Sequence, residues 1–179
     1  MKSLTKWMST PTPTVLPQSP DYYNARVAVA VLSGGMSSRL FTEVREKRGL
    51  CYTVFASYNA LKEMAGIWCY AGATPDKAQQ TYDVIIAELK KLADGISDEE
   101  MARAKIGLQS ALIMQSESTS ARARAAATDY YTLGKVRRLD EIKQQIEKIT
   151  AKSVLDFLKK NPFDKFCSVT IGPAEIKTV

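Results

Sequence analysis

The chain has 179 residues, of which 45% are hydrophobic and 25% are charged, and its formal net charge is +6. These are ordinary values for a globular domain, and no apolar run approaches the roughly 20 residues of a membrane-spanning helix, so we expect no membrane span. Lysines and arginines are scattered rather than interleaved with aromatic residues, which argues against a surface that binds nucleic acid.

The first 18 residues form a segment that is rich in Ser, Thr and Pro. Pro11, Pro13 and Pro17 each lack a backbone donor and disfavour both a helix and a central strand. We therefore expect residues 1–18 to be a flexible, extended lead-in and residues 19–179 to form one domain. The lead-in also lacks the apolar core of a secretory signal, so the sequence assigns no compartment.

A first helix is predicted directly after the lead-in. Ser19, Pro20 and Asp21 supply a cap residue, a proline for the first helical position and an acid for the first turn. The pattern predicts a helix that reaches about residue 32, where Gly34 and Gly35 end it.

A second, shorter helix is expected after this glycine pair, because Leu40, Phe41 and Val44 would share one face. Gly49 ends that helix. Beyond it, residues 51–58 and 65–73 both alternate between larger and smaller side chains. They predict an antiparallel strand pair joined around residues 60–64.

The second half of the chain is predicted to be mostly helical. One helix begins at Thr74-Pro75-Asp76 and ends at Gly95, and a capping box from Ser97 to Glu100 begins a long helix that reaches about residue 115. Further helices are expected up to Gly134, over residues 139–149 and over residues 150–160, with a last strand over residues 166–171.

This order of elements indicates an α+β protein in which helices pack on one face of a largely antiparallel sheet. The strands that the pattern predicts are few for so large a helix layer. We therefore expect that the sheet lacks its first strand within this chain.

Two consecutive segments resemble a known signature. Residues 32–41 (LSGGMSSRLF) and 43–52 (EVREKRGLCY) are similar to the second half of pitrilysin/insulinase-family zinc peptidases, the group of mitochondrial processing peptidase. Further matches occur in family order, so that the resemblance covers about residues 19–173. They are Asp21-Tyr22-Tyr23, the turn at 72–75, the run 117–120 with Arg122, Tyr130-Tyr131, Gly134 and Gly172-Pro173.

The resemblance implies a fold and a mechanism. In such peptidases two similar halves, on one chain or two, close around an extended peptide, and the first half binds zinc through an H-x-x-E-H helix. The second half contributes an arginine and a tyrosine, and Arg45 and Tyr52 occupy the matching positions here. A guanidinium and a phenol both donate hydrogen bonds at neutral pH, as a scissile carbonyl oxygen that gains charge requires.

Each of these features also has a plainer interpretation. Arg45 could be a solvated cation in the last turn of a helix, and Tyr52 a half-buried strand aromatic. Gly34 and Gly35 could expose amides to an anion, but no P-loop Lys-Ser/Thr follows them, so they are interpreted with Gly49 as structural turns. The strand over residues 65–73 is either a core strand or an edge to which an extended substrate adds.

The sequence contains no histidine, so both imidazoles of an H-x-x-E-H helix are missing. Cys51, Cys69 and Cys167 lie far apart and are expected to be free thiols that bind no metal. We therefore expect no cofactor on this chain, with zinc on a partner subunit, and no peptide hydrolysis by the chain alone.

These observations predict a non-catalytic half or subunit of a zinc metallopeptidase. It would close over an extended peptide substrate and supply Arg45 and Tyr52 to a zinc site on a partner chain. A missing strand would leave a sheet edge open, so the expected partner is a zinc-bearing peptidase subunit or a second copy of this chain. The alternatives are a catalytically inactive scaffold and a truncated remnant of such a peptidase.

Overall fold

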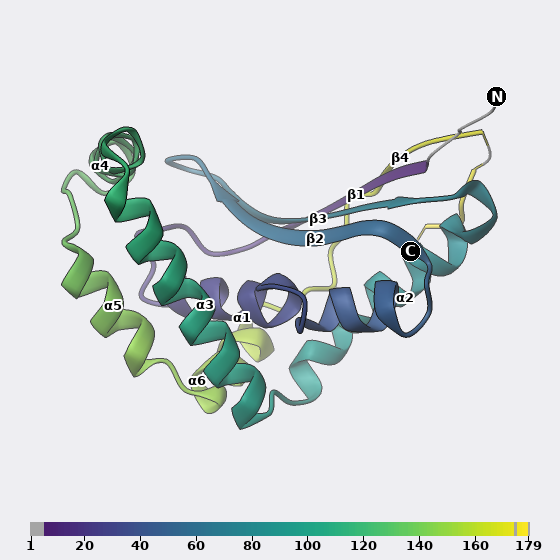
Figure 1. Cartoon of the computed structure of the whole chain (residues 1–179), viewed down its shortest axis with the longest axis horizontal. Coiled ribbons are helices and arrows are strands. Elements are labelled where there is room, and N and C mark those ends of the chain that lie inside the picture. Colours follow the sequence, from purple (N-terminus) through teal and green to yellow (C-terminus); the bar gives the residue numbers. More distant parts are fainter. Residues whose placement is uncertain (1–5, 174, 179) are drawn as a thin grey trace.

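The computed structural model describes residues 6–173 and 175–178, so residues 1–5 of the predicted lead-in lie outside it. A fully antiparallel sheet has the order β2-β3-β1-β4. Its strands are β1 (Lys6–Pro13), β2 (Cys51–Ala60), β3 (Ala65–Ala73) and β4 (Val169–Ile171). Most of the helices pack on one face of this sheet (Figure 1), which confirms the predicted α+β class.

The helical segments begin and end close to where the sequence predicts them. The capping box is present, because Ser97 Oγ accepts from the Glu100 amide at 3.2 Å and a Glu100 carboxylate oxygen accepts from the Ser97 amide at 2.9 Å. In chain order the segments are α1 (Tyr22–Ser33), η1 (Phe41–Glu46), η2 (Pro75–Lys77), α2 (Ala78–Lys91), η3 (Leu92–Asp94), α3 (Asp98–Glu117), α4 (Thr119–Leu133), α5 (Leu139–Lys148) and α6 (Ala151–Lys160).

Strand β1 corrects two of the expectations. Residues 6–13 do not form a flexible lead-in, because they pair with β3 over eight positions and with β4 over three. The sheet therefore contains a strand ahead of α1, and the prediction that it lacks its first strand is wrong. Because β1 fills this position, a missing strand is no longer a reason to expect pairing with another chain.

The prolines of β1 fit the sheet because their nitrogens face away from β3. The Thr14 amide donates to the Ala65 carbonyl at 3.1 Å, whereas the Pro11 carbonyl points to the opposite side and accepts from the Cys167 amide at 3.1 Å. Backbone groups of alternate residues face alternate sides of a strand, so Pro11 and Pro13 lose no bond to β3. The usual exclusion of proline from inner strands therefore does not apply here.

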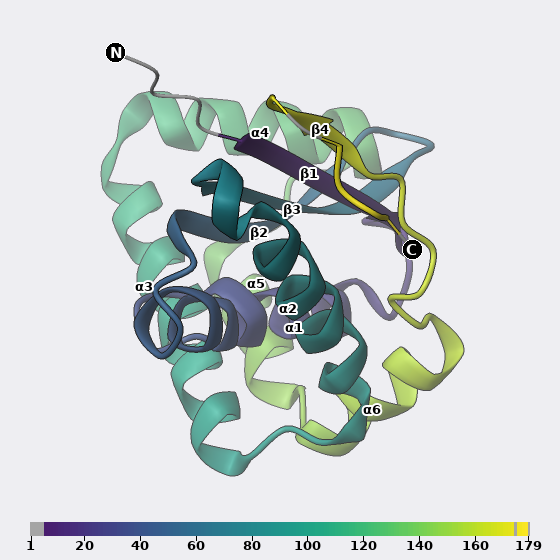
Figure 2. The same ribbon diagram turned by 90° about the vertical axis from the view of Figure 1, so that its right-hand side faces the viewer.

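The core lies between the sheet and the helices, with α1 at its centre. Val27 and Leu32 of α1 are fully buried, as are Val44 of η1 and Ile67 of β3. Helix α4 lies apart from this layer, beyond the β2–β3 hairpin (Figure 1) and behind the sheet when the molecule is turned (Figure 2). Within the described residues, no helix is both long enough and apolar enough to cross a membrane.

Candidate functional site

One face of the sheet points away from the helix layer (Figure 1), and exposed aromatic side chains lie on it. Along β3, Ile67 is buried against the helices whereas Trp68 is 46% exposed on the opposite face. On neighbouring β2, Phe55 is 45% exposed and its ring stacks on that of Tyr70, with 5.2 Å between centroids. We call Tyr52, Phe55, Trp68 and Tyr70 the open-face cluster.

Tyr52 is presented on this face by a β-bulge and a glycine. Cys51 pairs with Ala73 and Thr53 pairs with Gly72, so Tyr52 is an extra residue with no opposite position on β3. Its ring lies over Gly72, where an added Cβ would be 2.5 Å from both Cζ and Oη of the tyrosine. The side chain remains 50% exposed. Bulge and glycine together hold a phenol at the surface.

Arg45 lies in the last turn of η1, as predicted. This segment is a π-helix, in which the Lys47 amide donates to the Thr42 carbonyl at 2.9 Å, five residues earlier. Such wide turns are rare and occur frequently at functional sites. The exposed guanidinium of Arg45 lies over the Phe41 ring, 4.9 Å from its centroid.

The charges around Arg45 leave this residue unpaired. Glu43 accepts from Lys47 Nζ and from Arg48 Nη1, both at 2.6 Å, and these hydrogen bonds lower the pKa of the Glu43 carboxyl, that from Lys47 most. Arg45 forms no ion pair with any carboxylate in the part of the chain that the structure describes. Its donor groups are therefore available to an external acceptor.

Side chains of η2 and of the start of α2 hold the turn between Arg45 and Tyr52 in place. Gly49 has a φ of +57°, a conformation that favours glycine. Lys77 Nζ donates to the Gly49 carbonyl at 2.9 Å, and Thr81 Oγ1 lies 3.2 Å from the Leu50 carbonyl. Arg45 and Tyr52 stand on either side of this anchored turn, without a hydrogen bond or ring contact between their side chains.

The Gly34-Gly35 turn connects α1 to the segment that leads into η1. A Cβ at Gly34 would collide with the Ala30 carbonyl oxygen, and Gly35 has a φ of +139°. The Gly35 carbonyl accepts from the amide and the hydroxyl of Ser38, at 3.1 and 2.6 Å. Both glycines thus serve the chain reversal.

Arg39, the next residue, anchors this segment to α3. It donates from Nε and Nη2 to the Glu100 carboxylate at 2.6 and 2.9 Å, and from Nη2 to the Gly95 carbonyl at 2.6 Å. The hydrogen bonds from Arg39, with further ones from Ser97, lower the pKa of Glu100 to about 2. The start of η1, and hence Arg45, is held to the helix layer through this pair.

The residues present do not fit a zinc ion. The sequence has no histidine, and no group of three or more Cys, Asp or Glu side chains is arranged to hold a metal within residues 6–173 and 175–178. The three cysteines, all of them described, form no disulfide. The chemistry that this site offers is hydrogen-bond donation and aromatic contact.

Comparison with known proteins identifies the family. Residues 8–108, more than half of the chain, match the family model described as the peptidase M16 inactive domain. The chain belongs to the M16 peptidase family. The resemblance found in the sequence is thereby confirmed.

Curated relatives of this M16 domain are longer proteins. An uncharacterized zinc protease of Rickettsia felis is 33% identical over 156 residues, which cover 87% of this chain and 38% of the relative. The uncharacterized zinc protease YmxG of Bacillus subtilis is 29% identical over 155 residues, 85% of this chain and 37% of the relative. The chain thus spans little more than a third of the length of these two relatives.

Solved structures share the fold. A chain of complex III2 from Candida albicans has a TM-score of 0.83 at 22% identity, over 94% of this chain and 43% of that one. An M16 inactive domain from Pseudomonas fluorescens has a TM-score of 0.77 at 21% identity, over 100% of this chain and 43% of that one. An inactive peptidase domain from Bordetella parapertussis reaches 0.77 at 18% identity, over 100% and 96%.

Sequence reasoning on this M16 domain missed part of the site. It selected neither Phe55 nor Trp68, although the alternation along residues 65–73 carried the signal that Trp68 faces away from the core. The suggestion that this strand is an edge is wrong, because β3 pairs with β2 on one side and β1 on the other. The edge beside the open-face cluster is β2.

Proposed function

We propose that this M16 domain is the non-catalytic half of a zinc peptidase. It closes over an extended peptide and directs Arg45 and Tyr52 at a zinc site on a partner chain. One observation carries the proposal: an unpaired, exposed arginine and a half-exposed tyrosine stand on either side of one anchored turn, in a domain whose described residues include no group of three or more His, Cys, Asp or Glu placed to hold a metal.

The two side chains suit one step of peptide hydrolysis. The carbonyl oxygen of a scissile peptide gains negative charge as a nucleophile adds to its carbon, and donors aimed at that oxygen lower the barrier. Arg45 is a permanent cation with several N–H donors, and Tyr52 donates a phenolic O–H. Neither group needs to change its protonation state in order to act at neutral pH.

The sheet offers a surface to the rest of the substrate. An extended peptide can add to the outer edge of β2, which is the end strand of the sheet. The open-face cluster beside it supplies aromatic contacts, through Phe55 and Trp68 in particular. The name zinc protease borne by longer relatives, of which this chain spans about a third, supports a partner half that holds the metal.

The test combines this protein with an M16 subunit from the same organism that carries an H-x-x-E-H helix. Cleavage of a fluorogenic peptide is measured with the wild type and with Arg45→Ala and Tyr52→Phe. Loss of one donor to a developing oxyanion costs about 10²- to 10³-fold in kcat, so each variant should approach that loss.

Matched controls distinguish the proposal from the alternatives. Arg103→Ala and Tyr130→Phe remove the same chemical groups from exposed positions on α3 and α4 and should leave cleavage unchanged. A complex that forms and cleaves equally well with every variant would favour the inactive scaffold. Failure of the chain to bind any zinc-bearing M16 subunit would favour a remnant.

A further inference from the structure

A second surface, separate from Arg45 and Tyr52, is a groove among α1, α3, α4 and α5. Its volume is about 1450 Å³. Sites for small molecules usually measure about 300–1,000 Å³, so this groove is large enough for a segment of another macromolecule.

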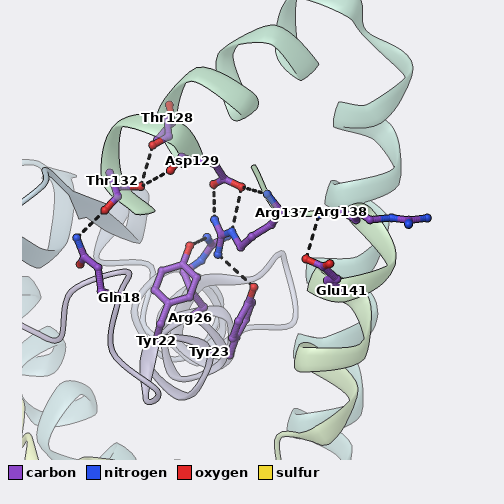
Figure 3. A network of polar contacts seen from close by, with 10 residues as sticks. All are labelled: Gln18, Tyr22, Tyr23, Arg26, Thr128, Asp129, Thr132, Arg137, Arg138 and Glu141. Carbon is purple, nitrogen blue, oxygen red and sulfur yellow. Dashed lines mark hydrogen bonds and ion pairs between the residues drawn. The ribbon is translucent and has the colours of Figure 1, made fainter. Parts of the chain in front are cut away.

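A polar network lies beside the groove at the C-terminal end of α4 (Figure 3). Asp129 of α4 is buried and receives Arg137 Nη2 and Nε at 2.5 and 3.0 Å. Arg137 Nη1 also donates to Tyr23 Oη of α1 at 3.1 Å, and its guanidinium lies 5.3 Å from the centre of the Tyr22 ring. These contacts connect α4, the loop that follows it and α1 at one side of the groove.

The lining of the groove is mostly apolar, and few residues of α4 are buried. Leu108 and Leu112 of α3 and Ile142 of α5 line it, together with the alanines of α4. In α4 only Asp129 and Thr132 are buried, although the helix has 15 residues. A helix gains most of its stability by packing an apolar face, and α4 has little of that packing within this chain.

The charged side chains that line the groove are mostly positive. Its charged lining residues are five arginines and two aspartates. Arg122 and Arg124 of α4 are exposed and form no ion pair with a described residue, and Arg138 lies 3.9 Å from Asp140 with both side chains almost fully exposed. Asp129 is already neutralised by Arg137. An excess of positive charge thus surrounds an apolar floor.

From these observations we propose that the groove binds an acidic amphipathic helix of a partner protein. The apolar face of such a helix packs on the alanines of α4 and the leucines of α3, as in helix-in-groove recognition. Its acidic flank pairs with Arg122, Arg124 and Arg138 at the rim. Nucleic acid fits less well, because the floor is aliphatic and offers few stacking surfaces.

The test uses a designed peptide helix with leucines on one face and glutamates on the flanks, labelled for fluorescence anisotropy. The wild-type chain should bind it, with affinity that falls as salt rises. The double variant Arg122→Glu/Arg124→Glu should bind about 3- to 30-fold more weakly, from the loss of two exposed charge pairs. Lys152→Glu/Lys165→Glu, with the same charge change outside the groove, should keep more of the affinity.

Any of four outcomes would overturn the proposal. The first three are no binding of the acidic peptide, equal weakening by the groove variant and its control, and undiminished binding when the peptide's leucines are replaced by serine. Displacement of the peptide by single-stranded DNA of equal charge would show that the groove selects charge alone, and would also overturn it. Circular dichroism of the variants excludes unfolding as the cause of a loss. None of these results depends on peptidase activity.

Discussion

The position of Tyr52 depends on the absence of a side chain at Gly72. A Cβ there would meet the far end of the Tyr52 ring, which can move, rather than the backbone. We therefore expect Gly72→Ala to displace the phenol with little loss of stability. Cleavage with a zinc-bearing partner should fall as it does for Tyr52→Phe, while the melting temperature stays close to that of the wild type.

A matched control for this prediction is Gly66→Ala, also on β3. A Cβ at Gly66 lies 3.3 Å from the Thr12 carbonyl oxygen and away from Tyr52. Cleavage should persist in that variant. If Gly72→Ala retained full cleavage, the bulge and glycine would not be what positions Tyr52.

Because of the Arg39–Glu100 pair, we expect the free energy of unfolding to decrease at acid pH. Hydrogen bonds from Arg39 lower the pKa of Glu100 from 4.5 to about 2. A carboxylate whose pKa is lowered by folding stabilises the fold above its unfolded pKa, and that stabilisation is lost as the pH falls toward its folded pKa. The free energy of unfolding should therefore decrease between pH of about 4.5 and about 2.

Glu100→Gln isolates this contribution. Urea unfolding near neutral pH should show a loss of about 1–3 kcal/mol, because a charge-assisted hydrogen bond is removed from a partly buried arginine. The difference from the wild type should shrink toward pH 2. Glu99→Gln is the control, since its pair with Arg103 is largely exposed and should contribute less than about 1 kcal/mol. Equal pH dependence of both variants would contradict the assignment.

Local sequence signals predicted the helices well and strand β1 badly. Caps such as Ser97 and stops such as Gly95 act within one turn, so they can be identified in a sequence. Whether Pro11 is tolerated in a strand depends on which way its nitrogen points, and that depends on β3 and β4, more than 50 residues away. Arg45 and Tyr52 were selected through a family resemblance. The roles of Gly72 and Phe55 could not be predicted in this way, because they depend on the register in which β2 pairs with β3.

Because the backbone nitrogens of Pro13 and Thr14 face opposite sides of the strand, substitutions at these two positions should differ in their effect on stability. Thr14→Pro removes the bond from the Thr14 amide to Ala65 and should lower the free energy of unfolding by about 1–3 kcal/mol. Pro13→Ala adds an amide that faces away from β3 and should change it by no more than about 1 kcal/mol. Chemical denaturation measures both. Equal effects of the two substitutions on the free energy of unfolding would mean that the Thr14 nitrogen does not face β3 while the Pro13 nitrogen faces away from it.

The sheet is assembled from strands of the beginning, the first half and the end of the chain. Strand β1 precedes all the helices, β4 follows them, and the two pair with each other. One hydrophobic cluster extends from Ala25 of α1 to Phe163 beyond α6. Such interleaving leaves no boundary at which the sheet and the helix layer could separate.

We therefore expect the chain to unfold as one cooperative unit. Trp68 lies on β3, so its fluorescence follows the sheet, whereas far-ultraviolet circular dichroism follows mainly the helices. The two signals should give the same midpoint in urea, as two-state unfolding requires. Thr14→Pro should shift both midpoints together, because a weakened sheet removes the surface on which the helices pack. An earlier transition in the dichroism alone would show instead that some of the helices, with the sparsely buried α4 foremost, unfold as a separate unit.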